Sequence, residues 1–184
     1  MKLRLLVAAV FALGAVAVRA EQPAGVAEAL KEMASEHATH TSFTLDRDML
    51  ETANGWSGDG GGPVAGLNSI TFENYKYHEP AFYIPENVAA LVKAYDAAGW
   101  MHLVDQNASP KQSTAPTKPV TDLWMHFHGP DIDGLTVVVR GPKQMSVIEV
   151  SGILKPLDLV HLSGHFGIPK VDPSTVMVPA GPGK

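Results

Sequence analysis

The sequence predicts a two-layer α+β domain, in which a mainly antiparallel sheet of about five strands carries helices packed on one face. Three strand-like segments follow one another between Leu123 and Ser151, separated by short turns, as in an antiparallel meander. Helical patterns lie upstream, and only the one that starts at Pro85 is placed to connect parallel strands. The chain has 184 residues and no cysteine, so we expect a packed core rather than disulfides to hold it together.

The first twenty residues are typical of a signal peptide. Lys2 and Arg4 precede an apolar run from Leu5 to Val18, and small residues lead to a cleavage point after Ala20. The apolar run is shorter than the ~20 residues that cross a bilayer as a helix. We therefore expect a periplasmic or secreted protein that has no stable membrane anchor after signal cleavage.

The remaining chain divides into residues 21–40 as an N-terminal helix and linker, residues 41–169 as a single α+β domain, and residues 170–184 as a flexible tail. The signal peptide holds three of the fourteen basic residues and none of the nineteen acidic ones, so the mature chain carries a net charge of −8. Because phosphate contacts need lysine and arginine, this acidic chain is not expected to bind nucleic acid.

In the N-terminal part, Val26, Leu30, Met33 and His37 recur at helical spacing and predict a helix within residues 21–40. A short strand is expected over residues 42–45. Asp46 is then placed to cap a helix over residues 47–54, which Gly55 would end. A Gly-rich loop is expected over residues 58–63.

In the central part, bulky residues predict a strand from Leu67 to Tyr77. A helix is expected from Pro85, which suits the first turn, to Gly99. A strand then begins at Trp100 and runs to Val104, and a proline-bearing loop covers residues 107–119.

In the C-terminal part, strands are expected over residues 123–128, 135–140 and 145–151. The Asp133-Gly134 pair, with Asp131 nearby, predicts the first turn between them. Residues 141–144 predict the second turn. A closing helix is expected over residues 157–166.

Residues 144–152 form a Val/Ile-rich strand that ends in glycine, residues 156–159 follow as the start of a short helix, and residues 164–169 form a segment with Gly-Ile-Pro. Upstream of them lie a strand at residues 70–75, a helix from residue 88 that ends at Gly99-Trp100, and a strand at residues 132–138 that begins with a turn containing glycine. On these segments the chain resembles the bacterial domain-of-unknown-function 4252 family over residues 41–169. The resemblance implies an exported envelope protein with the same α+β layout, and it implies no reaction and no catalytic residues. The loop at residues 58–63 and the insertion at residues 109–119 depart from the family pattern.

Histidines on one expected strand form the first candidate site. His126 and His128 lie two residues apart, so they point to one face together with Trp124, while the apolar residues between them point to the core. We expect this Trp124 face to be open, either as a solvated surface, as a ligand-binding face, or as a metal site built on His126 and His128 with a third ligand.

Other pairs carry weaker patterns. His161 and His165 have helical ligand spacing but lack the glutamate of zinc hydrolases. His37 and His40 are three apart at the expected end of the first helix, where the helix dipole favours a cation. Asp131 and Asp133 lack the rest of a calcium loop and fit a turn.

No nucleophile, base and polarising group occur together in a recognisable motif. We therefore expect an uncharacterised exported protein that acts as a non-enzymatic interaction or binding module of the cell envelope, with an unidentified protein partner and no cofactor. Two alternatives stay open. One is a histidine-based metal-binding protein, with hydrolase activity as an option, and the other is a small-ligand carrier that uses the open sheet face.

Overall fold

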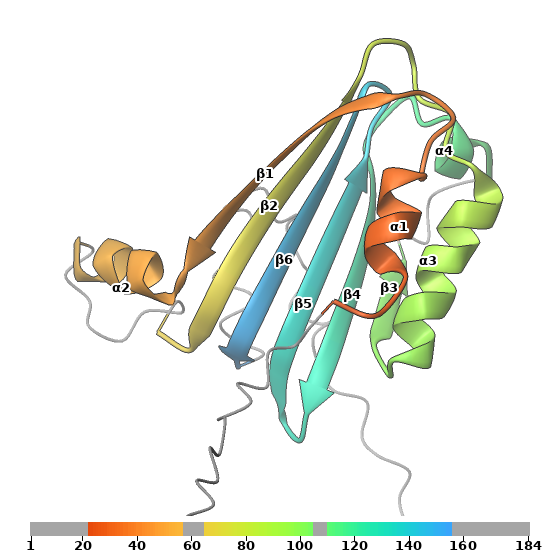
Figure 1. The fold of residues 1–184 in the computed structure, drawn as a ribbon. Helices are drawn as coiled ribbons and strands as arrows, with labels where there is room; N and C mark the ends of the chain where they lie inside the picture. Colours follow the sequence, from red (N-terminus) through yellow and green to blue (C-terminus); the bar gives the residue numbers. More distant parts are fainter. Residues whose placement is uncertain (1–21, 57–64, 105–109, 156–184) are drawn as a thin grey trace, which may run out of the picture.

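The computed structural model describes residues 22–56, 65–104 and 110–155. In this part of the chain six strands form one antiparallel sheet in the order β1-β2-β6-β5-β4-β3, as Figure 1 shows. The strands are β1 (Ala38–Asp46), β2 (Leu67–Tyr77), β3 (Met101–Val104), β4 (Val120–His128), β5 (Asp131–Arg140) and β6 (Gln144–Leu154). The α+β class is confirmed, and the described sheet has six strands rather than about five.

Four helices accompany the sheet in the described residues. They are α1 (Val26–Lys31), α2 (Arg47–Trp56), α3 (Pro85–Ala97) and α4 (Pro110–Thr114). In Figure 1, α1 and α3 lie together over the half of the sheet that contains β3, β4 and β5, whereas α2 lies at the end of β1. The signal peptide, the loop at 58–63, the closing helix at 157–166 with His161 and His165, and the tail at 170–184 lie outside the described residues.

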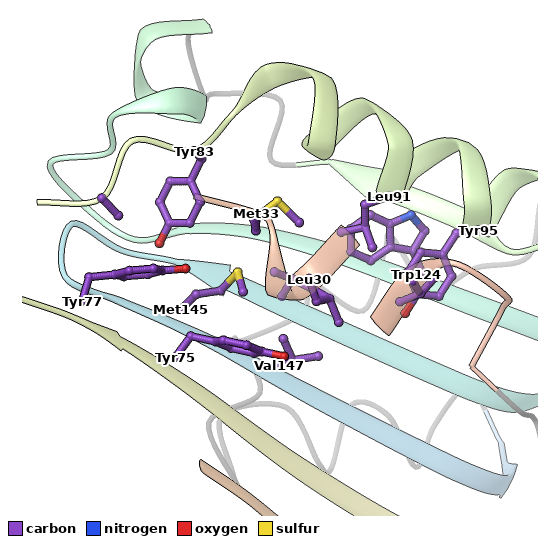
Figure 2. Close-up of a cluster of buried hydrophobic side chains, with 13 residues drawn as sticks. Leu30, Met33, Tyr75, Tyr77, Tyr83, Leu91, Tyr95, Trp124, Met145 and Val147 are labelled. Atoms are coloured by element: carbon purple, nitrogen blue, oxygen red, sulfur yellow. The ribbon is translucent and has the colours of Figure 1, made fainter. Parts of the chain in front are cut away.

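A core of aliphatic and aromatic side chains fills the space between the sheet and the helices α1 and α3. Leu30 and Met33 from the α1 region and Leu91 and Tyr95 from α3 are almost fully buried, and they meet Trp124 of β4. Figure 2 shows these side chains above the strands, with Tyr95 beside Trp124. Burial at roughly 25 cal/mol per Å² of apolar surface makes this core a main source of stability.

The opposite face of the sheet is also apolar. Its buried residues alternate with those of the helix-covered face along each strand, as the pleat requires. α2 contributes Leu50 to this second cluster. The sheet residues of the cluster are Leu67, Ile70, Leu123, Met125, Ile132, Leu135, Val137, Ile148, Val150 and Leu154.

Several expected elements are confirmed. β2 has the bounds expected, and α3 begins at Pro85 and is followed by Gly99, whose φ of +80° suits glycine. The carboxylate of Asp46 accepts a hydrogen bond of 3.0 Å from the backbone N–H of Met49, which is the expected cap of α2. That helix extends to Trp56, one residue past Gly55.

Other expectations were wrong in detail. The first helix stops at Lys31, and β1 begins at Ala38, so His37 and His40 do not share a helix face. The turn between β4 and β5 lies at Gly129-Pro130, where Gly129 has a φ of +63°, and Asp133-Gly134 lies within β5 beside an irregularity in the pairing. A short helix, α4, lies inside the segment expected to be a loop.

Candidate functional site

Trp124 does not lie on an open face. Its side chain is 1% exposed, because α3 covers this side of β4. The Trp124 ring stacks on Tyr95 at 4.7 Å and on His102 at 4.5 Å between centroids. The expectation that Trp124 lies on an open face of the sheet is therefore wrong.

The two expected metal ligands of β4 have different surroundings. Nδ1 of His126 lies 2.5 Å from a carboxylate oxygen of Asp133, and the ring of Trp100 lies 5.5 Å away. His128 is exposed at the end of β4. Within the described residues, no group of three or more His, Asp and Glu is placed to hold a metal ion. The third ligand that the metal hypothesis requires is not found there.

A buried charged network joins β3, β4, β5 and α4, and the sequence pattern did not indicate it. Nη2 and Nε of Arg140 donate to Oδ2 of Asp122 at 2.7 and 3.2 Å, and Nε2 of His102 lies 3.2 Å from Oδ1 of Asp122. Arg140 also donates to the backbone carbonyl of Ser113 at 2.5 Å. Burial raises the pKa of Asp122, but His102 and Arg140 outweigh that effect and hold this pKa below its ordinary value.

On the helix side of the sheet, β1 and β2 carry a second polar cluster. His40 stacks on Tyr75 with 4.4 Å between centroids, and Nε2 of His40 lies 3.0 Å from a carboxylate oxygen of Glu73. The hydroxyl of Tyr75 donates to the same carboxylate oxygen at 2.7 Å. Glu73 is thus held between a ring nitrogen and a hydroxyl, beside the strand that forms the sheet edge.

Glu149 of β6 lies next to this cluster. Glu73 pairs with Val147 and Thr71 pairs with Glu149, so the two glutamates are diagonal neighbours on one face of the β2·β6 pair. The side-chain amide of Gln22 donates to Glu149. Burial, followed by the charge of Glu73, raises the pKa of Glu149 to about 7.

A groove of about 590 Å³ opens beside the first residues of β1. Lys31 and Glu32 at the end of α1 line one part of it, and His40 and Tyr75 line another. His37, the other member of the expected histidine pair, also lines it. The groove therefore joins the polar cluster of β1 and β2 to the end of α1.

The outer edge of β1 is the most open part of the described sheet. β1 pairs with β2 over nine consecutive residues, and no described strand pairs with its other side. Seven of its nine residues are exposed, among them Phe43 at 56%. We call this edge, with the side chains of residues 38–46, the β1 surface.

No protein-family model, no curated protein and no solved structure matches this chain. Among the described helices, none is long and apolar enough to cross a membrane.

Proposed function

We propose that this protein is an exported, non-enzymatic interaction module of the cell envelope, which binds an extended segment of a partner protein as an added strand on the β1 surface. The observation that carries the proposal is the open nine-residue edge of β1. An unpaired strand edge offers a row of N–H and C=O groups to another chain. Domains that bind peptides in this way gain affinity from main-chain hydrogen bonds and specificity from alternate side chains.

The two sheet edges differ in how they are protected. β3, at the far edge, has only four residues, and a short edge strand limits pairing with other chains. β1 has none of the usual protective features between Ala38 and Leu45, because that stretch has no proline, no charged lysine or acid, and no bulge against β2. An edge left open over this length supports a role in binding.

The side chains of the β1 surface indicate what the added strand carries. Phe43 projects on the apolar side of the sheet, where its cross-strand neighbour is Phe72. His40 projects on the opposite side, where it contacts Glu73. Since the mature chain is also acidic, we propose a partner segment that alternates apolar side chains toward Phe43 with basic or hydroxyl side chains toward Glu73.

The groove beside β1 supports the same proposal. An added strand that runs along residues 38–40 passes the groove mouth, where Ala38 and His40 are lining residues. Glu32 and Glu36 also line the groove, so a basic side chain near the end of the segment would find carboxylates there. Strand edge and groove together make a binding surface longer than the edge alone.

The test places a photo-crosslinking amino acid at Thr41 in one variant and at Phe43 in another, and the protein is illuminated in its native cell envelope. Both positions point to one face, so moving the probe by two residues should move the crosslink by two residues along one partner segment. A probe at Lys93, which is exposed on α3, is the matched control and should not label that segment. Crosslinks without this spacing, or crosslinks to a second copy of the chain, would contradict the proposal.

Proline variants test whether backbone pairing is involved. In an antiparallel pair, backbone N–H groups alternate between the partner strand and the free edge, so Thr41→Pro and Ser42→Pro remove donors on opposite sides. The variant that removes an outward donor should keep its melting temperature and lose the crosslinks. The other variant should lose stability. If both variants keep folded protein and full crosslinking, strand addition is wrong.

A further inference from the structure

The groove beside β1 lies on the helix-covered side of the sheet. Ala38 and His40 line it, and both project from the same face of β1, because side chains two residues apart in a strand share a face. His40 pairs with Tyr75 of β2, which also lines the groove and belongs to the core under α1 and α3. A strand added beside β1 would present every second side chain to this side, and the side chain opposite Ala38 would lie at the groove.

Backbone pairing builds the wall of the groove beyond β1. Ala34, in the segment between α1 and β1, forms an isolated bridge with Tyr83, which precedes α3. The backbone N–H of Ser35 donates to the carbonyl of Phe82 at 3.0 Å. The space of about 590 Å³ is therefore bounded by described, mutually bonded segments, and it is large enough for a long side chain.

Two carboxylates in this groove lack a cationic partner. Glu32 and Glu36 are lining residues, and neither forms an ion pair with a described residue. Lys31 also lines the groove, but its ammonium lies 3.9 Å from the carboxylate of Glu28. A basic group from a partner would therefore meet negative charge in the groove that the described residues do not neutralise.

Glu36 is the better fixed of the two carboxylates. Its Oε1 accepts a hydrogen bond of 2.6 Å from the hydroxyl of Ser35, and its Oε2 accepts one of 2.8 Å from the backbone N–H of Phe82. The bond from Ser35 has the largest effect on the pKa of Glu36, which is lowered, so the group is ionised at neutral pH. Each carboxylate oxygen has two lone pairs, so both oxygens can accept a further N–H donor.

A guanidinium group suits these surroundings. Its planar fork donates two parallel N–H bonds to a carboxylate, and it also stacks on aromatic rings. The groove provides both kinds of contact, since the ring of His40, stacked on Tyr75, lines it together with Glu36. Its apolar lining residues can contact the methylene stem of an arginine, and they are Ala34, Ala38 and Ile84.

We propose that the added strand runs antiparallel to β1 and carries an arginine whose guanidinium binds the Glu36 carboxylate in the groove. This inference rests on the proposed function and names one side chain of the partner. All pairs in the described sheet are antiparallel, and antiparallel pairs are slightly more stable per residue. β1 begins at Ala38, so the C-terminal end of an antiparallel segment lies there, and the arginine is the residue opposite Ala38.

The crosslinks from Thr41 and Phe43 also report the direction of the segment. In an antiparallel segment, the residue labelled from Phe43 lies on the N-terminal side of the residue labelled from Thr41. A third probe, in place of the exposed groove residue His37, should label the arginine or its neighbour on the C-terminal side of the Thr41 label.

Each other result of this experiment has a distinct meaning. The reverse order of labels, a His37 label on a stretch without arginine, or no His37 label would overturn the inference and leave strand addition standing. The absence of labels from Thr41 and Phe43 would contradict the proposed function itself.

Binding measurements then isolate the charge. A synthetic peptide with the sequence of the labelled segment is compared with one in which citrulline, which is uncharged and nearly the same shape, replaces the arginine. Fluorescence anisotropy should show that citrulline weakens binding to the wild type by roughly three- to tenfold. In the Glu36→Gln variant the two peptides should bind alike. Glu79→Gln is the matched control, because it removes the same charge at an exposed position outside the groove lining, and it should keep the difference.

Two results of the binding measurements would overturn the inference. One is equal binding of the arginine and citrulline peptides to the wild type, which needs no variant and does not depend on how Glu36→Gln folds. The other is a difference that Glu36→Gln keeps in full, which would place the arginine on another group. Strand addition would stand in either case.

Discussion

The guanidinium of Arg140 and the carboxylate of Asp122 form a salt bridge of 2.7 Å in which both side chains are more than 90% buried. Removing one partner leaves the other charge buried and unpaired, which costs about 3–5 kcal/mol. We therefore expect Asp122→Asn to lower the free energy of unfolding by that amount in urea denaturation. Glu51→Gln is the matched control, because its pair with Arg47 is exposed and should contribute less than about 1 kcal/mol. Similar losses in the two variants would contradict a special role for burial.

The same pair predicts an acid dependence of stability. The pKa of Asp122 is lower in the folded protein than in the unfolded chain, so its contribution is present above the unfolded pKa of ~3.9 and is lost as the pH falls through the folded pKa. The stability difference between the wild type and Asp122→Asn should be full at pH 6 and shrink below about pH 4. Urea denaturation at several pH values measures it. A constant difference down to pH 2 would show that Asp122 is not acting as a carboxylate.

Trp124 should act as a core residue. It is 1% exposed and stacked between Tyr95 and His102, so Trp124→Ala should cost about 3–5 kcal/mol through lost contacts and an unfilled cavity. Phe82 is an aromatic residue that is 47% exposed, and Phe82→Ala should cost less than about 1 kcal/mol. Thermal and urea denaturation of both variants check this. A small effect at Trp124 would mean that α3 does not cover it in solution.

Gly152 should tolerate no side chain. Its φ is +124°, and a Cβ there would lie 2.5 Å from the carbonyl oxygen of Gly66 and 2.5 Å from Cα of Leu67. Both strain and collision oppose Gly152→Ala, so we expect a loss of at least about 3 kcal/mol. Gly129 has a φ of +63° with open space around it, so Gly129→Ala should cost only about 1–2 kcal/mol. Equal losses at the two glycines would contradict the close approach of Gly152 to Gly66 and Leu67.

Local patterns predicted the elements that depend on local physics. The bulky run from Leu67 to Tyr77 and the helix from Pro85 have strong signals of their own, and Asp46 caps α2 as expected. The turn between β4 and β5 was misplaced because Asp133-Gly134 is a common turn pair, whereas Gly129-Pro130 makes the turn. The bulge-like irregularity at Gly134 explains why a turn residue occurs inside a strand.

The candidate site depended on tertiary structure and was harder to predict. The alternation of residues along β4 correctly placed Trp124 on the opposite face of the strand from Leu123 and Met125. Both faces of that strand are buried, however, and alternation alone does not tell which faces of a sheet are covered. Glu73 and Glu149 are far apart in the sequence and meet only because β6 inserts beside β2. The hydroxyl-rich stretch Thr39–Thr44 was the available signal for an exposed edge strand, and its length becomes clear only from the pairing with β2.

The pairing of β2 with β6 also has a consequence for the order in which the chain folds. β6 is the last described strand, yet it lies between the paired strands β1 and β2 and the group of β5, β4 and β3. Contacts this distant in sequence are slow to form, because the intervening chain must first be brought together. A nascent polypeptide therefore cannot close its sheet until residues near Leu154 have been synthesised.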